Sequence, residues 1–207
     1  MTAASESDPE AKAVLQKVRK KYEAYKNLEA AFSLIVEIPE QPAKTEKGII
    51  TQAGKSNYKV ELPEQTWWSD GKSLWIHQKE KKLVQINDAA DPEDGSLSPQ
   101  DLLRIYERSD FVYVLVNEYS DKKRILQQIE LKPLDKNTDY HKIRIEVDKK
   151  TADLVNVKAF FKDGARYTVQ LDKITPNKTL PAGFFTFDAK NCPAGKGKVC
   201  GLADPFQ

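Results

Sequence analysis

The feature that most constrains this chain is a predicted β-hairpin, in which Asp70-Gly71 separates two strand-like runs. Gly71 tolerates the positive φ that tight hairpin turns need, so the pair is a strong local signal. Residues 65–69 and 73–78 carry large apolar side chains, and all three tryptophans of the chain lie in these two runs. A hairpin with this much aromatic surface needs a cover, which is either other parts of the protein or a ligand.

Runs of alternating apolar and polar residues continue on both sides of this hairpin. In residues 57–62, Tyr58, Val60 and Leu62 alternate with charged residues. The turns are short and contain Gly, Asn or charged residues, which indicates an antiparallel meander and not βαβ units. We predict strands over residues 32–38, 47–53, 57–62, 65–69, 73–78, 82–87, 111–119, 125–133, 141–148, 154–162 and 166–174.

A helix is predicted at the N-terminal end of the chain, where Asp8 is a suitable cap and Pro9 suits the first helical position. Its basic residues fall largely on one side and form either a docking surface or an ordinary solvated face. The apolar residues at helical spacing are Ala11, Val14, Leu15, Val18, Tyr22 and Tyr25, and the basic residues are Lys12, Lys17, Arg19, Lys20 and Lys21.

A second, short helix is predicted from Ser98 to Glu107, where it interrupts the meander. Ser98 can cap it and Pro99 suits its first position. A helix inserted between the strands of a meander must lie across the sheet or over its open end, so this one is a candidate lid. Its apolar side chains are Leu102, Leu103, Ile105 and Tyr106.

Length and charge exclude several classes of protein. The 207 residues suit one domain, which we expect to span residues 8–207 after a disordered tail at 1–7. The net charge of +2 gives no basic excess for nucleic acid. No apolar run is long enough for a membrane span. The sequence does not begin like a signal peptide, which fits a cytosolic protein or the mature form of a secreted one.

The two cysteines, Cys192 and Cys200, lie in a Pro- and Gly-containing segment that closes easily into a loop. We expect a disulfide, which would stabilise the fold by about 2.5 kcal/mol in the chain-entropy model and would point to an oxidising compartment such as the periplasm. The alternative is two free thiols in a cytosolic protein. A zinc site is disfavoured, because the only histidines, His77 and His141, are distant in sequence.

No catalytic signature is found. The sequence contains no G-x-S-x-G, H-E-x-x-H or C-x-x-C motif and no Gly-rich phosphate loop. His77 and His141 are lone strand histidines, which are more often structural or exposed than catalytic, and Asp70 is best explained by the hairpin turn. We therefore predict a protein that is not an enzyme and that needs no metal or cofactor.

Apolar residues are abundant on one predicted face of the sheet. They either form an ordinary core or also line an apolar cavity, which we expect because one helix and a short lid are too little to fill so large a sheet. The candidates for this inner face are Phe32, Leu34, Val36, Tyr58, Val60, Leu62, Trp67, Trp75, Phe111, Tyr113, Ile143, Ile145, Tyr167 and Val169.

Ser69-Asp70-Gly71-Lys72-Ser73-Leu74-Trp75 resembles the periplasmic outer-membrane lipoprotein carrier family, LolA. The N-terminal helix leading to Phe32-Ser33-Leu34, the Leu97-Ser98-Pro99 helix start and the late Phe185-Thr186-Phe187 appear in the order of that family. The resemblance extends from about Asp8 to Val199. It implies an α+β, mainly β fold: an unclosed, strongly curved antiparallel half-barrel of about ten or eleven strands, with the helix and lid over its concave face.

The resemblance also implies a function. Members of the family hold the acyl chains of lipoproteins in an apolar cavity and shuttle them from the inner to the outer membrane. The implied partners are acylated lipoproteins, an inner-membrane lipoprotein-releasing ABC transporter and an outer-membrane acceptor, and the implied state is a periplasmic monomer. The family's functional Arg after the second strand is absent, since residues 52–57 contain only Lys55 as a cation.

Three other functions remain open. A sensor or acceptor with the same fold would need a second domain or an N-terminal lipid-modified Cys. A lipid hydrolase would need a nucleophile and a base. A protein-interaction module would bind unacylated partners as well as acylated ones.

Overall fold

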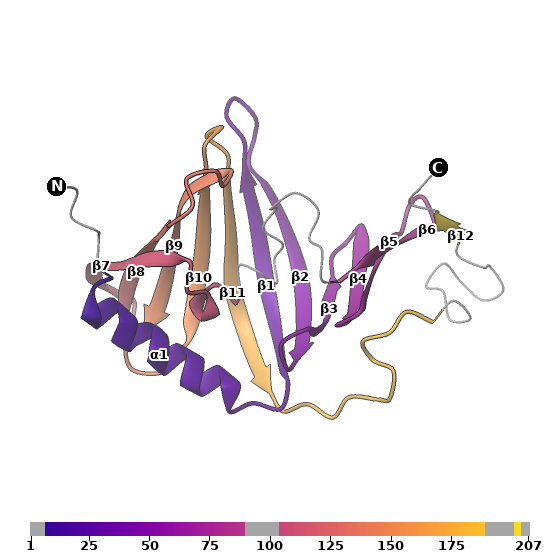
Figure 1. The fold of residues 1–207 in the computed structure, drawn as a ribbon, viewed down its shortest axis with the longest axis horizontal. Helices are drawn as coiled ribbons and strands as arrows, with labels where there is room; N and C mark the ends of the chain where they lie inside the picture. Colours follow the sequence, from indigo (N-terminus) through magenta and orange to yellow (C-terminus); the bar gives the residue numbers. More distant parts are fainter. Residues whose placement is uncertain (1–6, 90–103, 189–200, 204–207) are drawn as a thin grey trace. The chain divides into compact units, whose positions relative to one another are not determined.

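The computed structural model describes residues 7–89, 104–188 and 201–203 (Figure 1). Within these ranges it contains one α-helix, one 3₁₀ turn and twelve strands. The elements are α1 (Pro9–Glu23), β1 (Leu28–Glu37), β2 (Lys44–Ala53), β3 (Asn57–Glu61), β4 (Gln65–Asp70), β5 (Ser73–Gln78), β6 (Leu83–Asp88), η2 (Ile105–Glu107), β7 (Phe111–Asp121), β8 (Arg124–Pro133), β9 (Tyr140–Asp148), β10 (Leu154–Phe161), β11 (Arg166–Pro176) and β12 (Gly201–Ala203).

The strands form one sheet in the order β12-β6-β5-β4-β3-β2-β1-β11-β10-β9-β8-β7. The meander of long strands pairs antiparallel, for example β4 with β5 and β8 with β9, whereas the short β12 lies parallel to β6. The sheet is not closed, because β12 and β7 are its two edges. The predicted fold class, mainly β with an unclosed antiparallel sheet and one N-terminal helix, is confirmed. The strand β12 was not predicted, since the tail reads as irregular.

The chain divides into two compact units, whose boundaries fall inside β1, β2 and β11. The first unit comprises Met1–Ala24, Ser33–Thr45 and Gly95–Asp172, and the second comprises Tyr25–Phe32, Glu46–Asp94 and Lys173–Gln207. In the described part of the chain, no helix combines the length and the apolar character that crossing a membrane requires.

The start of α1 follows the predicted capping pattern. The Asp8 carboxylate accepts the backbone N–H of Glu10 at 2.9 Å, and Pro9 is the first helical residue. The other Asp8 carboxylate oxygen accepts the N–H of Leu115 at 3.3 Å, while the Asp8 N–H donates to the carbonyl of Tyr113 at 2.8 Å. These bonds satisfy backbone groups of β7, an edge strand, and fix where the helix begins.

The first unit has a well-defined core on one face of its strands. The register places Ile145 opposite Ile129 on one side and Val157 on the other, and Val157 opposite Val169. All four side chains have no exposed surface. We call the face that carries them the inner face, and α1 lies across its strands (Figure 1). The residues that α1 buries are Ala11, Val14, Leu15, Val18 and Tyr22.

The second unit buries residues on both faces of its strands. On one face, Gly48 allows close packing, since a Cβ there would lie only 2.6 Å from Cζ of Phe32 and 2.9 Å from Cδ2 of Leu62. The register continues this face through Val60 and Trp67. We call it the Phe32 face. The residues on the opposite face include Trp68, Trp75, His77 and Val84, and we call this the Trp75 face.

Candidate functional site

Several predicted cavity residues form the core of the first unit. Ile143, Ile145 and Val169 have no exposed surface, and Phe111 is 3% exposed. They share one face, as predicted, and α1 runs across the strands of that face (Figure 1). In this structure these residues pack against protein.

Other predicted residues of the same face are only half-buried. Leu34 and Val36 from β1 and Tyr167 from β11 each retain exposed surface. Leu171, two residues beyond Val169, is also half-buried and extends the set. We call Leu34, Val36, Tyr167 and Leu171 the apolar strip. Leu171 was not among the predicted site residues, although it continues the alternation of Tyr167 and Val169.

Polar contacts on the opposite face establish which way the apolar strip points. Ser33 Oγ bonds Asp172 Oδ2 at 3.0 Å, and Lys158 Nζ donates to Glu37 Oε2 at 2.7 Å. Ser33 and Glu37 therefore lie on the outer face of β1, opposite the core. Because successive side chains of a strand alternate between faces, Leu34 and Val36 point to the inner face.

A row of four aromatic rings connects the core to the apolar strip. The ring centroids of Phe111 and Tyr140 are 6.2 Å apart, those of Tyr140 and Phe161 are 6.3 Å apart, and those of Phe161 and Tyr167 are 4.8 Å apart. Phe111 and Tyr140 are buried, whereas Phe161 and Tyr167 are half-buried. These spacings fit the usual geometry of interacting aromatic pairs. The row forms an apolar aromatic surface on the inner face.

Sequence reasoning missed Tyr140 and Phe161. The pairing of β10 with β9 shifts between Phe160 and Phe161, so that Phe161 lies opposite Tyr140. The extra residue lies in β9, between Tyr140 and Lys142, so Tyr140 departs from the alternation of Ile143 and Ile145. Phe161 continues the alternation of Val157 and Ala159, which is a signal that could have identified it.

Tyr113, another predicted residue, is half-buried on the inner face of β7, where it lies opposite Leu131. Its hydroxyl donates to the carbonyl of Arg108. Burial, followed by the nearby Asp110 carboxylate, raises the pKa of Tyr113, so the hydroxyl stays protonated and able to donate. This bond ties β7 to the segment that follows η2.

The Phe32 face of the second unit contains five predicted residues. Phe32, Tyr58, Val60 and Leu62 are buried. Trp67 is half-buried, and its indole N–H donates to the Gln65 side-chain oxygen at 2.9 Å.

The prediction that Trp75 shares a face with Trp67 is wrong. Trp67 lies opposite Ile76, whereas Trp75 lies opposite Trp68. The turn contains only Gly71 and Lys72, so an odd-numbered residue of one strand faces an even-numbered residue of the other.

The chain's own C-terminal segment covers the Trp75 face. Phe187 and Trp75 both pack against Val84, and the ring centroid of Phe187 lies 5.5 Å from that of Trp68. Lys59 Nζ lies 5.8 Å from the centroid of Trp68 and 5.2 Å from that of Phe184. Protein therefore supplies at least part of the cover that the aromatic hairpin needs.

The two histidines lie in different units and differ in burial. His77 is 1% exposed on the Trp75 face, and neither ring nitrogen has a hydrogen-bond partner among the described residues. Burial, followed by the charge of Lys79, lowers the pKa of His77 and favours its neutral form. His141 is exposed on a strand of the first unit. Residues 7–89 and 104–188 contain no group of three or more His, Cys, Asp or Glu side chains that could hold a metal ion.

Asp70 has the turn role that the sequence indicates. Its carboxylate accepts the backbone N–H groups of Ser73 and Lys72, both at 2.9 Å. These bonds hold the pKa of Asp70 below its usual value, with Ser73 the larger contributor. Asp70 therefore stabilises the hairpin as an anion.

Only the end of the predicted lid lies within the described residues. Ile105 and Tyr106 are buried, and Tyr106 stacks on Tyr22 of α1 with centroids 5.5 Å apart. Arg104 makes a two-pronged bond to Glu107, at 2.8 and 2.7 Å. Here the chain forms a 3₁₀ turn anchored on α1. Leu102, Leu103, Cys192 and Cys200 lie outside the described residues.

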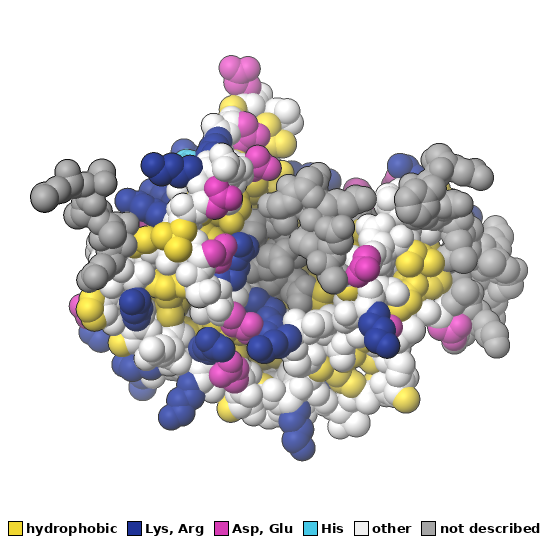
Figure 2. Space-filling view, in the orientation of Figure 1, with side chains coloured by type: hydrophobic (Ala, Val, Ile, Leu, Met, Phe, Trp, Pro, Cys, Tyr) yellow, Lys and Arg dark blue, Asp and Glu magenta, His cyan; other side chains and the backbone are white. Residues whose placement is uncertain are grey.

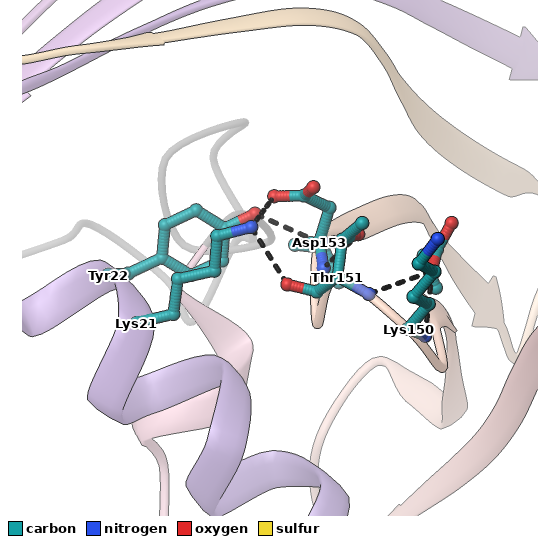
Figure 3. A network of polar contacts seen from close by, with 7 residues as sticks. Lys21, Tyr22, Lys150, Thr151 and Asp153 are labelled. Atoms are coloured by element: carbon teal, nitrogen blue, oxygen red, sulfur yellow. Dashed lines mark hydrogen bonds and ion pairs between the residues drawn. The ribbon is translucent and has the colours of Figure 1, made fainter.

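The C-terminal end of α1 is fastened to the turn between β9 and β10 (Figure 3). Lys21 Nζ donates to the carbonyl of Thr151 at 2.8 Å and to the carboxylate of Asp153. Beside it, the Tyr22 hydroxyl accepts the backbone N–H of Leu154 at 3.0 Å. These contacts fix the end of the helix over the inner face.

The basic side of α1 is exposed, and Figure 2 shows Lys and Arg side chains over this helix. Arg19 pairs with Glu23 at 2.8 Å, and Lys21 pairs with Asp153. The remaining lysines of the predicted basic set are Lys12, Lys17 and Lys20, all exposed.

The sequence matches one family model, described as outer membrane lipoprotein carrier protein LolA, over residues 25–188. No curated protein matches the chain.

Three solved structures illustrate the similarity of fold. An uncharacterized conserved protein from Thermus thermophilus has a TM-score of 0.60 at 8% identity, with 94% of this chain and 98% of that chain covered. A DUF1329 family protein from Desulfovibrio piger has a TM-score of 0.53 at 12% identity, with 86% and 98% covered. LprF from Mycobacterium bovis has a TM-score of 0.50 at 11% identity, with 85% and 98% covered.

Proposed function

Because the chain belongs to the LolA family of outer membrane lipoprotein carrier proteins, we propose that it binds the acyl chains of lipoproteins and carries them through the periplasm. The single observation that carries this proposal is the apolar strip. Its four side chains adjoin a fully buried core but keep exposed surface of their own. An apolar ligand laid on the strip would remove this surface from water.

The magnitudes suit a carrier. Each buried CH₂ group contributes about 0.8 kcal/mol, so one long acyl chain gains on the order of 10 kcal/mol when it is fully enclosed. A carrier must also release its cargo, and full enclosure of several chains would be effectively irreversible. A surface that covers each chain only in part binds it more weakly and allows transfer to an acceptor.

The finer parts of the proposal follow from family membership. The partners would be acylated lipoproteins, an inner-membrane lipoprotein-releasing ABC transporter and an outer-membrane acceptor, and the protein would act as a monomer without catalytic activity. Opening of the predicted helix from Ser98 to Glu107 would admit the chains. The burial of Ile105 and Tyr106, and the stacking of Tyr106 on Tyr22 of α1, support a fixed C-terminal end for such a lid.

Displacement of a fluorescent apolar probe by a triacylated lipopeptide tests the proposal, with the same peptide lacking acyl chains as a control. The informative variant is Leu34→Gln, and the matched control is Ile35→Gln on the opposite face of the same strand. Both residues are half-buried. We expect Leu34→Gln to weaken lipopeptide binding by roughly three- to tenfold, since it places a polar group on the binding surface. Ile35→Gln should leave binding unchanged.

Two outcomes would contradict the proposal. Equal weakening by the two variants would show that the inner face is not the binding surface. Equal displacement by the acylated and unacylated peptides would favour a peptide-binding module. Circular dichroism of each variant ensures that only folded protein is compared.

A further inference from the structure

The outer face of the first unit carries an unusual group of cations around one phenylalanine. The centroid of the Phe160 ring lies 5.0 Å from Lys142 Nζ, 5.3 Å from Arg144 Cζ, 5.7 Å from Lys158 Nζ and 5.9 Å from Arg166 Cζ. Each distance is within the range of about 6 Å in which a cation is attracted to an aromatic face. We call these five residues the Phe160 cluster.

Strand pairing fixes the members of the Phe160 cluster next to one another. Phe160 lies directly opposite Lys142 of β9 and Arg166 of β11, and Lys158 lies opposite Arg144. The cluster therefore spans three neighbouring strands. Its position is set by backbone hydrogen bonds, so the cations are held close together despite their mutual repulsion.

Two carboxylates neutralise only part of this charge. Glu130 accepts from Lys142 at 2.8 Å and from Arg144 at 2.6 Å, and Glu37 accepts from Lys158 at 2.7 Å. Arg166 is exposed, and its charge helps to lower the pKa of Glu37, but no carboxylate of a described residue lies close enough to form an ion pair with it. Four cations and two carboxylates leave two positive charges on this small area.

Both carboxylates are ionised at neutral pH. Burial acts to raise the pKa of Glu130, but its bonds to Lys142 and Arg144 hold that pKa below the usual value. The bond from Lys158 likewise lowers the pKa of Glu37. The cluster and its two carboxylates therefore place positive and negative groups at fixed positions, with a net positive charge.

We propose that the Phe160 cluster is a docking surface for an acidic segment of a partner protein, whose Asp or Glu side chains bind Arg166 and the neighbouring cations. Guanidinium groups present paired N–H donors that match a carboxylate, and these charge-assisted bonds are stronger than neutral ones. An excess of two charges can be satisfied by two carboxylates on one peptide segment.

A discrete acidic segment fits the cluster better than an anionic membrane surface does. Glu130 and Glu37 stand among the cations and would repel a continuous layer of negative headgroups, whereas a peptide can place its carboxylates away from them. The one apolar side chain of the cluster, Phe160, is half-buried and is not among the large exposed apolar residues of the described part of the chain, so the cluster offers little surface for insertion into lipid.

The cluster lies on the opposite side of the same strands from the core of the inner face. Ala159, next to Phe160 in β10, has no exposed surface and pairs with Ile143. A docked partner would therefore leave the apolar strip accessible. The inference goes beyond acyl binding and does not depend on it.

The test measures binding of a fluorescein-labelled oligoglutamate peptide by fluorescence anisotropy, at about 20 mM and about 150 mM salt. The informative variant is Arg166→Gln. The matched control is Arg124→Gln, which removes the same charge from another exposed arginine of this unit, one paired with Asp121. We expect Arg166→Gln to weaken binding by roughly three- to tenfold at the lower salt and Arg124→Gln by less than about twofold.

Equal effects of the two variants would overturn the proposal, because they would show a response to net charge alone. Failure of the wild-type protein to bind the peptide at the lower salt would overturn it as well. Vesicles containing phosphatidylglycerol provide a further arm. If Arg166→Gln weakens binding to these vesicles but leaves binding to the peptide unchanged, the surface binds a membrane and the proposal is wrong.

Discussion

The Tyr22 hydroxyl should hold the end of α1 more firmly than the Lys21–Asp153 ion pair does. In Tyr22→Phe, the backbone N–H of Leu154 loses the acceptor that now lies 3.0 Å away in a buried position. Leaving a buried donor unsatisfied costs about 1–3 kcal/mol. The ring itself is retained, so its stacking on Tyr106 is preserved.

The ion pair is expected to contribute less. The side chains of Lys21 and Asp153 are 27% and 36% exposed, and partly solvated pairs of this kind contribute about 0–1 kcal/mol. Lys21→Met also removes the bond to the Thr151 carbonyl, but that bond is exposed and water can replace it. Lys21→Met should therefore lower the free energy of unfolding by less than Tyr22→Phe does.

Urea unfolding followed by circular dichroism gives the two free energies, and hydrogen exchange of the Leu154 amide reports on the bond directly. We expect Tyr22→Phe to be the more destabilising change and to reduce the protection of this amide. The reasoning fails if Lys21→Met costs as much as Tyr22→Phe, or if the protection of the Leu154 amide does not change in Tyr22→Phe.

Three further predictions concern the second unit. Gly48→Ala should lower the free energy of unfolding by about 1–3 kcal/mol, because its Cβ would overlap the Phe32 ring, and a Phe32→Leu background should reduce this cost in the same urea experiment. Backbone N–H groups hold the pKa of Asp70 in the folded protein below its unfolded value of about 4. The stability that ionised Asp70 contributes is therefore complete above about pH 4 and is lost as the pH falls through the folded pKa. Asp70→Asn should make the free energy of unfolding depend less on pH in this acid range. In the same urea experiment, Trp75→Ala should lower the free energy of unfolding, because it removes a ring that packs together with Phe187 against Val84.

Sequence patterns predicted the regular elements because each pattern has a local physical cause. Alternation over residues 141–148 marks β9, which runs from Tyr140 to Asp148. Capping by Asp8 and the fixed φ of Pro9 mark the first residue of α1. Such signals involve only residues close together in the sequence, so they can be recognised without knowledge of the fold.

The face assignment of Trp75 failed for a reason that the sequence itself contains. A two-residue turn at Gly71 and Lys72 pairs residue 67 with residue 76, so Trp67 and Trp75 cannot share a face. By contrast, the extra residue of β9 that brings Tyr140 opposite Phe161 gives no signal in the alternation of residues 141–148.

The sequence does not predict how much of the inner face is covered by other parts of the protein. Ile145 and Leu34 look equivalent in sequence, since each is an aliphatic residue in an alternating run. Ile145 is fully buried, whereas Leu34 is half-buried. The helical stripe of α1 predicts that the helix packs on the sheet, but it does not say on which strands. The strands on which α1 packs determine which apolar residues belong to the core and which are candidate contacts for a ligand.

The central claim, that acyl chains lie on the apolar strip, is tested most directly by photo-crosslinking. A photoreactive amino acid is placed at Val36 on the inner face or at Ile35 on the outer face, and a triacylated lipopeptide is added before illumination. The account predicts a crosslink to the acyl part of the lipopeptide from position 36 and none from position 35. Equal crosslinking from both positions, or crosslinking from position 35 alone, would contradict it.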